Sequence, residues 1–261
     1  MADGPVLVTV DGHIATLTLN VPDKRNAMSE EMTDAFPHAV ASIAAHPDVR
    51  AVIVTGNGTS FCAGGDLDFL HTGDRNVVAL REKMTTFYPK FLTLLDLDVP
   101  TIAAINGPAI GAGLCLALMC DMRVADQDAP MGMTFVRIGI HPGMMATALL
   151  SRAVSHTWAA ELFYTGRIVT GAEALHMGLV NRAVPKDRLM AETQALAEQV
   201  AANGPIALRY VKQGMKELFR DAAEKASAWE GYAQPVTMAT EDVQEGLRAV
   251  RERRPGNFQG R

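Results

Sequence analysis

The chain has 261 residues, of which 48% are hydrophobic, and it carries a formal net charge of −5. That length and composition allow one large buried core or a main domain with a smaller appendage. Because neither half has a basic stripe, the charge argues against nucleic acid or an anionic membrane surface as a partner.

Two further absences in the sequence restrict the kind of protein this is. No window reaches eighteen uninterrupted apolar residues, and the N-terminus lacks a basic region followed by an apolar one, so we expect a soluble protein that is not exported. The three cysteines show no C-x-x-C spacing, which predicts neither a disulfide framework nor a zinc site. A reducing cytoplasm is the expected location.

The chain opens with a hairpin pattern. Residues 6–19 alternate between apolar and polar side chains on either side of Asp11-Gly12, a strong two-residue turn signal. Ser29 then precedes apolar residues at helical spacing, which predicts an N-capped helix ending before His46.

The next segments alternate between strand and helix patterns, which predicts βαβ units. Residues 50–56 and 100–107 are short Val-, Ile- and Ala-rich runs that end in glycine, and a helical stretch at roughly 75–96 separates them. The polar loop at 68–76 is a candidate lid over whatever lies beside it.

Two glycine-rich loops are the most informative feature of the chain. They read FCAGGDL at 61–67 and INGPAIGAGLCLALMCD at 105–121, each with an apolar strand in front of it. Such loops leave backbone N–H groups free at the top of a sheet, where two can converge on one developing negative oxygen, as in an oxyanion hole. The end of the second loop is apolar on every face, which predicts a central, buried helix.

The second half turns increasingly helical. Residues 121–125 read as a strand, 143–177 as helices broken at Thr165-Gly166 and Thr170-Gly171, and 178–184 as extended chain. From Asp187 onward the composition is helical, with Gly204-Pro205 as the one clear break. We therefore expect a core domain over 1–186 and a helical C-terminal module over 187–261.

Six ordered motifs resemble the enoyl-CoA hydratase/isomerase family, the crotonase superfamily, over about residues 6 to 258. They are LNVPDKRNAM, FCAGGDL, INGPAIGAG, MCDMRVA, GIHPG and YTGRIVTGAEALHMGLVNRAV. The resemblance implies an α/β fold, a crotonase-like spiral of ββα turns whose helical C-terminal module forms a homotrimer that often pairs into a hexamer. It also implies an acyl-CoA thioester as substrate, with coenzyme A as part of it and no separate cofactor.

The resemblance assigns residues to this site. The thioester oxygen would be held by the backbone amides of Gly65 and Ala112, and the adenosine end of coenzyme A would lie near Ala63. Lys24 and Arg25 are candidate phosphate contacts. Many relatives have a lysine near coenzyme A where this chain has Asp68, which weakens the expected phosphate affinity.

The usual acid–base residues of the family are missing. Relatives that hydrate enoyl-CoA use two glutamates, and alignment places Cys115 and Phe135 at those positions. A thiol three residues after Ala112 on the same helix is expected to face the pocket, but a buried apolar setting would keep it inert as a small core residue. Because hydration needs an acid and a base near the α and β carbons, ordinary hydratase activity is not expected.

Substitutes for the glutamates come from two places. His141 lies in the loop that normally borders the acyl pocket, and its ordinary pKa suits acid–base work. His71, with Asp68 in the candidate lid, is another possibility. Two functions stay open: an enzyme that stabilises a thioester enolate, as an isomerase or lyase of fatty acid metabolism does, or a non-catalytic acyl-CoA-binding protein. No metal-binding histidine spacing and no GxGxxG dinucleotide motif is present.

Overall fold

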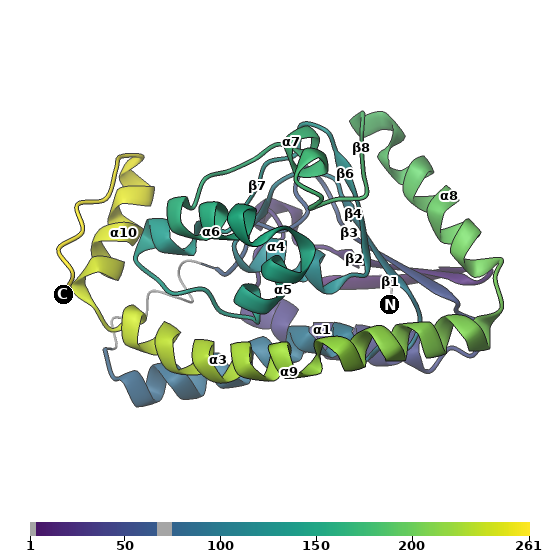
Figure 1. The fold of residues 1–261 in the computed structure, drawn as a ribbon, viewed down its shortest axis with the longest axis horizontal. Coiled ribbons are helices and arrows are strands. Elements are labelled where there is room, and N and C mark those ends of the chain that lie inside the picture. Colours follow the sequence, from purple (N-terminus) through teal and green to yellow (C-terminus); the bar gives the residue numbers. More distant parts are fainter. Residues whose placement is uncertain (1–3, 67–74) are drawn as a thin grey trace.

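A six-stranded sheet lies at the centre of the computed structural model, which describes residues 4–66 and 75–261 (Figure 1). The strand order is β1-β2-β3-β4-β6-β8, with β1 antiparallel to β2 and the other neighbours parallel. The strands of this sheet are β1 (Val6–Asp11), β2 (Ile14–Leu19), β3 (Ala51–Gly56), β4 (Thr101–Ile105), β6 (Met122–Asp126) and β8 (Arg182–Val184). A second, two-stranded sheet pairs β5 (Ala109–Ile110) with β7 (Met131–Gly132).

Helices enclose both faces of the large sheet. They are α1 (Glu30–Ala44), α3 (Val77–Leu92), α4 (Ala112–Met119), α5 (Ala146–Ala153), α6 (His156–Thr165), α7 (Gly171–His176), α8 (Leu189–Ala201), α9 (Pro205–Met238) and α10 (Glu241–Glu252). Short 3-10 turns are η1 (Pro22–Lys24), η2 (Thr93–Asp96), η3 (Thr134–Ile138) and η4 (Lys186–Arg188). This mixed α/β architecture, with a parallel sheet and a helical C-terminal region, confirms the expected fold class.

The local signals at the N-terminus are confirmed, with one small shift. β1 and β2 form the predicted hairpin, but Asp11 pairs with Ile14, so the turn is Gly12-His13, one residue later than predicted. Gly12 has φ of 55°, a left-handed conformation that glycine adopts without strain. Ser29 caps α1 by accepting a hydrogen bond from the N–H of Met32.

Alternation along β3 shows how the sheet separates two cores. Val52 and Val54 point into the main core with α1 and α4, whereas Ala51 and Ile53 point to the opposite face, where α8 covers them. All six residues of β3 are buried, as a strand covered on both faces requires.

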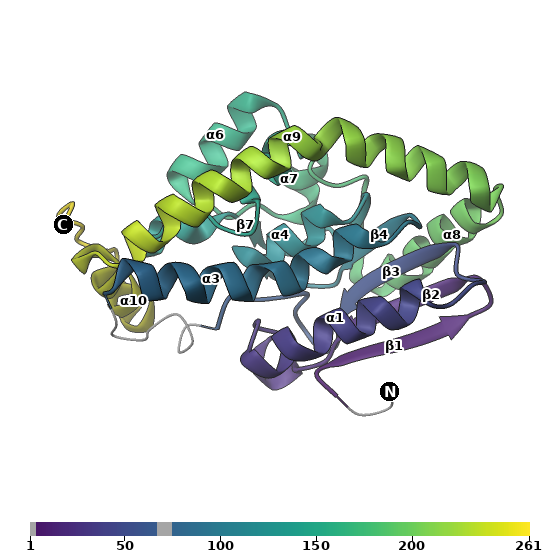
Figure 2. The same ribbon diagram turned by 90° about the horizontal axis from the view of Figure 1, so that it is seen from below.

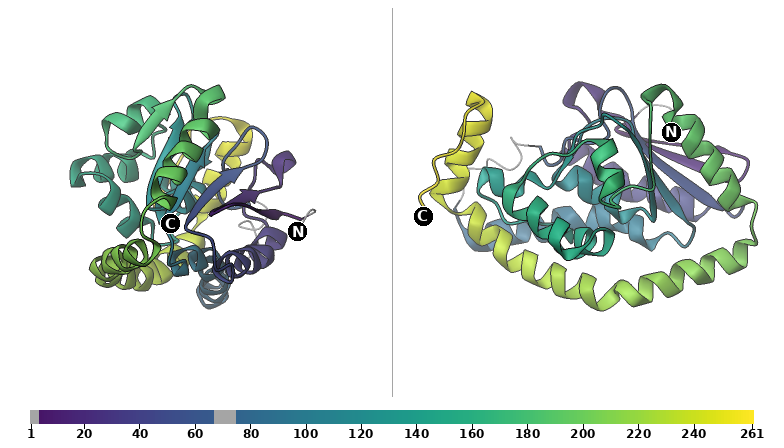
Figure 3. Two further views of the ribbon diagram at one scale, coloured as in Figure 1. Left: turned by 90° about the vertical axis from the view of Figure 1, so that its right-hand side faces the viewer. Right: turned by 45° about the horizontal axis from the view of Figure 1, so that its top comes forward.

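The C-terminal helices wrap around the core instead of standing apart from it. α9 begins at the predicted Gly204-Pro205 break and runs the length of the molecule from α8 to α10 (Figure 3). It lies beside α3 (Figure 2). α10 packs against η3. The contact with η3 is close, because a Cβ added to Gly246 would lie 2.5 Å from the Cα of Ile138.

The middle of the chain follows the predicted breaks but not every predicted element. α6 ends at Thr165 and α7 begins at Gly171, as the two Thr-Gly pairs indicate. Extended chain is predicted over 178–184, but the strand β8 has only three residues. In the part of the chain that the structure describes, no helix is both long enough and apolar enough to cross a bilayer.

Candidate active site

The two glycine loops lie directly against each other, backbone to backbone. Cys62 bridges Ala109: its N–H donates to Pro108 O at 3.0 Å, and its carbonyl accepts from the N–H of Ile110 at 3.1 Å. A Cβ added to Gly64 would lie 2.5 Å from Ile110 O and 3.6 Å from the nitrogen of Ala112. Only a residue without a side chain allows this approach, which brings the AGGD loop to the start of α4.

A cavity of about 470 Å³ opens where the loops meet. Both loops contribute to its wall, together with η1, η3, α3, α9 and α10. Gly65 and Ala112 line this one cavity, so the structure brings together the two residues expected to supply backbone amides.

The N–H of Gly65 is directed away from its neighbouring strand. Met28 donates to Gly64 O at 2.8 Å and accepts from the N–H of Asp66 at 3.5 Å, which is the pattern of a parallel bridge centred on Gly65. In such a bridge the central residue points its own N–H and C=O to the other side. Among the described residues no acceptor is paired with this N–H.

Ala112 is the first residue of α4, so its N–H has no partner within the helix. No other acceptor in the described chain takes a hydrogen bond from it. Gly111 precedes it with φ of 56° and ψ of −120°, a conformation open to glycine, and this sharp turn aims the start of α4 at the cavity. All eight residues of α4 are buried, as the sequence predicted.

Lys24, Arg25 and Ala63 also line the cavity. Lys24 is 63% exposed, with its Nζ 3.9 Å from a carboxylate oxygen of Asp66, and Arg25 accepts a hydrogen bond from the N–H of Ala63 through its carbonyl. The buried Asn26 fixes this edge by donating to the carbonyls of Asn57 and Ser60. Asp68, His71 and most of the 68–76 candidate lid lie outside the described residues.

Phe135 is part of the cavity wall, and its ring faces the turn at Gly111. It is carried by the 3-10 turn η3. An aromatic ring at this place shapes the cavity but moves no proton.

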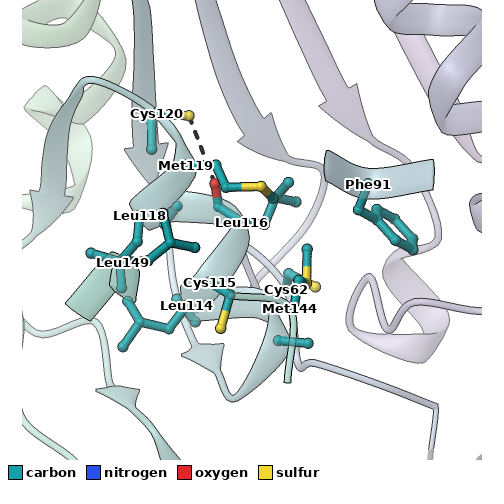
Figure 4. Packing of buried hydrophobic residues seen from close by; sticks show 14 of the residues in the cluster. Cys62, Phe91, Leu114, Cys115, Leu116, Leu118, Met119, Cys120, Met144 and Leu149 are labelled. Atoms are coloured by element: carbon teal, nitrogen blue, oxygen red, sulfur yellow. Dashed lines mark hydrogen bonds between the residues drawn. The ribbon is translucent and has the colours of Figure 1, made fainter. Parts of the chain in front are cut away.

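Cys115 does not line the cavity. Its side chain is fully buried, with Sγ 4.0 Å from Met133 Sδ and 3.9 Å from Gly143 O. Figure 4 shows it among Leu114, Cys62 and Met144. Burial raises the pKa of the thiol well above its ordinary value, so Cys115 stays protonated and has the environment of a core residue.

His141 is likewise not brought to the cavity wall. Its Nδ1 lies 2.7 Å from Pro142 O and its Nε2 lies 3.2 Å from the indole N–H of Trp229. The tautomer that satisfies both contacts carries its proton on Nδ1 and accepts from Trp229. Both ring nitrogens are therefore engaged, Nδ1 within the loop itself and Nε2 with α9.

Sequence reasoning missed the polar residues at the inner end of the cavity. Tyr88 from α3 and Gln234 from α9 line it together, and Gln234 Nε2 donates to the Tyr88 hydroxyl at 3.0 Å. Burial raises the pKa of Tyr88, so it acts as a neutral hydrogen-bonding group. Val250 of α10 reaches the same cavity. Nothing local in the sequence signals these contacts, since they join helices far apart in the chain.

Comparison with known proteins defines the class. The family model described as Enoyl-CoA hydratase/isomerase matches residues 9–261, and the chain belongs to this family. It is 39% identical to a Thermus thermophilus protein assigned provisionally as an enoyl-CoA hydratase, over 95% of this chain and 98% of that protein. It is 32% identical to the crotonyl-CoA hydratase of Syntrophomonas wolfei, over 99% of both chains. Among solved structures, an enoyl-CoA hydratase/isomerase from Pseudoalteromonas atlantica superposes with a TM-score of 0.86 at 30% identity, covering 98% of this chain and 100% of that one.

The family acts on coenzyme A thioesters. Among the described residues, no group of His, Cys, Asp or Glu side chains could hold a metal ion.

Proposed function

We propose that this protein binds an acyl-CoA thioester and stabilises its enolate with the N–H groups of Gly65 and Ala112. The observation that carries the proposal is that these two amides, from separate glycine loops, lack acceptors among the described residues and line one cavity. An enolate concentrates charge on the thioester oxygen, and each such donor is worth about 3 kcal/mol of transition-state stabilisation. Because Ala112 opens α4, the positive end of the helix dipole adds to the same place.

The coenzyme A portion extends toward the outer edge of the cavity. Ala63, in the first glycine loop, contacts the adenosine end, while Lys24 and Arg25 meet the phosphates. We also propose that Asp68 weakens phosphate binding, because its negative charge stands where many relatives have a lysine. Lys24 is well exposed, so its contribution is a modest, salt-sensitive one.

The chemistry that follows enolate formation is not ordinary hydration. Neither Cys115, which is buried and protonated, nor Phe135 can transfer a proton at the α or β carbon. His141 stays a catalytic candidate, although its two ring nitrogens are engaged with Pro142 and Trp229. An isomerase or a C–C bond-cleaving lyase needs only one base, and these are the activities that the proposal favours.

The same observation favours one alternative. A cavity with both amides in place but without the two glutamates suits a non-catalytic acyl-CoA-binding protein. The two functions separate in one assay, in which crotonyl-CoA and longer enoyl-CoAs are incubated with the protein while the conjugated thioester absorbance is followed. Turnover supports the enzyme, whereas tight binding without turnover supports the binder.

The amide at position 112 can be removed by mutation. Proline is well tolerated at the first position of a helix, so Ala112→Pro deletes the N–H with little cost to α4. We expect about a 100-fold loss of turnover, corresponding to the loss of one donor to the developing oxyanion. If the protein is a binder, the affinity for the thioester should fall by up to about tenfold, because a neutral carbonyl oxygen accepts a weaker hydrogen bond. The control is His156→Pro, at the first position of the exposed α6, where activity should not change.

Self-association and location complete the proposal. Large apolar side chains on α9 are exposed, among them Tyr210 (70%), Leu218 (90%) and Trp229 (58%), which is unusual for a surface that meets only water. They support self-association. The assembly that we propose is a homotrimer, or a hexamer of two trimers, in which the helical module of residues 187–261 forms the contacts and residues 1–186 form the core domain. Light scattering of the purified protein measures the subunit number. The three free, buried cysteines are compatible with a cytoplasmic location.

A further inference from the structure

Tyr88 and Gln234 form a wall between two cavities. Both residues line the active-site cavity of about 470 Å³, and both also line a second cavity of about 140 Å³ between α3 and α9. Gln234 Nε2 donates to the Tyr88 hydroxyl at 3.0 Å, so the two side chains meet from two different helices. The second cavity lies behind this Tyr88–Gln234 wall, on the side away from the active site.

The wall is held in place from behind. Gln234 is only 2% exposed, and its Nε2 also donates to His141 O at 3.2 Å, so both amide hydrogens are used. The backbone of Gly143 packs directly against the wall, because a Cβ added there would lie 2.5 Å from Gln234 Nε2 and 2.6 Å from the Tyr88 ring. This close packing leaves the two side chains little room to turn aside, and the wall keeps the two cavities separate.

The wall lies deeper in the protein than the two backbone amides. Ala112 is the first residue of α4, and Cys115 follows it by almost one turn, about 4.5 Å further along the helix axis. Cys115 Sγ lies 3.9 Å from the carbonyl oxygen of Gly143, the residue that supports the wall. An acyl chain that extends inward along α4 from a thioester held at Ala112 therefore meets the wall.

We propose that the Tyr88–Gln234 wall limits the length of the acyl chain, so that the protein accepts short-chain acyl-CoA esters and rejects longer ones. The two side chains act by their bulk, and their hydrogen bonds keep that bulk across the path of the chain. The limit is a short one, because the wall stands only about one helical turn beyond Ala112. This inference rests on the proposed function, because it takes the first cavity to be the acyl-CoA site.

The second cavity contains the space that a longer chain would need. Met84, Leu92 and Met144 give it apolar surface suited to methylene groups. At about 30 Å³ per small group, its volume of about 140 Å³ holds roughly four or five methylene groups. Each methylene group that is buried strengthens binding about fourfold. Removing the wall should therefore join the cavities and lengthen the chain that the protein accepts.

Titration calorimetry with saturated CoA esters from acetyl to decanoyl measures the length limit, the chain length beyond which affinity stops rising. Gln234→Ala and Tyr88→Ala each remove bulk from the wall, and each should move the limit upward by at least two carbons. The readout is the affinity for the ester two carbons longer than the wild-type limit, divided by the affinity for the ester at that limit. This ratio should be at least tenfold larger in either variant than in the wild type.

Gln234→Leu and Tyr88→Phe are the matched controls, since they keep the bulk of each side chain and remove its hydrogen bonding; both should keep the wild-type limit. Because the ratio is taken within each variant, a general loss of affinity does not change it, and either alanine variant alone decides the outcome. An unchanged limit in an alanine variant overturns the wall and leaves the proposed function intact, and so does a limit that moves as far in the controls. Failure of every ester to bind the wild-type protein overturns both.

Discussion

Replacing Gly113 by alanine tests whether the two glycine loops are in contact through their backbones. A Cβ at this position would lie 2.1 Å from Cys62 O and 2.8 Å from its carbonyl carbon. That carbonyl is held by the hydrogen bond from Ile110, so it cannot turn aside. Overpacking of this kind costs about 1–3 kcal/mol, and breaking the bridge adds about 1 kcal/mol, so we expect Gly113→Ala to lose roughly 3 kcal/mol of unfolding free energy.

The control is the same substitution at Gly214, inside α9, where an added Cβ meets no atom within 4 Å. Alanine there should stabilise the protein by about 0.5–1 kcal/mol, because glycine is the poorer helix former. Urea denaturation followed by circular dichroism measures both changes. The melting temperature should fall by roughly 6–12 °C for Gly113→Ala and rise by roughly 1–4 °C for Gly214→Ala.

Acyl-CoA affinity provides a second readout for the same pair. Moving α4 away from Cys62 shifts Ala112 relative to Gly65, so Gly113→Ala should also bind a thioester at least tenfold more weakly, a change of about 1.4 kcal/mol. If Gly113→Ala were as stable as the wild type and bound the thioester equally well, the close approach of the loops would be refuted.

Three further predictions concern charged groups. Burial raises the pKa of Glu230, so its contribution to stability is present at acid pH and is lost as pH rises through that pKa; Glu230→Gln should remove this decline in urea titrations at several pH values. Hydrogen bonds, first from Arg254, lower the pKa of Glu245 to about 2, and Arg254→Ala should raise it measurably in an NMR titration; an unchanged pKa would contradict that pairing. Lys212 is 5% exposed, and its Nζ lies 2.7 Å from Asp121 Oδ2. Lys212→Met should lower the unfolding free energy by about 3–5 kcal/mol, because it leaves the carboxylate without its cation. A loss below about 1 kcal/mol in urea denaturation would show that solvent replaces the pair.

Local patterns predicted much of the fold. The hairpin, the Ser29 cap and the Gly204-Pro205 break are determined by neighbouring residues, and each is present. The buried nature of α4 was equally predictable, because its sequence is apolar on every face. The same property explains why the orientation of Cys115 was not, since a helix without a polar face gives no signal for which side meets a cavity.

The inner end of the site could not be predicted, because it depends on tertiary contacts. Tyr88 and Gln234 are 146 positions apart and meet only when α3 and α9 pack together. His141 is of a residue type suited to acid–base catalysis and lies in a loop near the site, yet Trp229 of α9 donates a hydrogen bond to its ring. Both the Tyr88–Gln234 contact and the position of the His141 ring depend on how the C-terminal helices pack against the core. No motif in the sequence predicts that packing.

A crystal structure with a bound saturated acyl-CoA measures the central geometry directly. We predict that the thioester oxygen lies 2.7–3.1 Å from the nitrogens of both Gly65 and Ala112, the range expected for donors that stabilise an oxyanion. A thioester oxygen bound elsewhere in the cavity, or within hydrogen-bonding distance of only one of the two nitrogens, would contradict it.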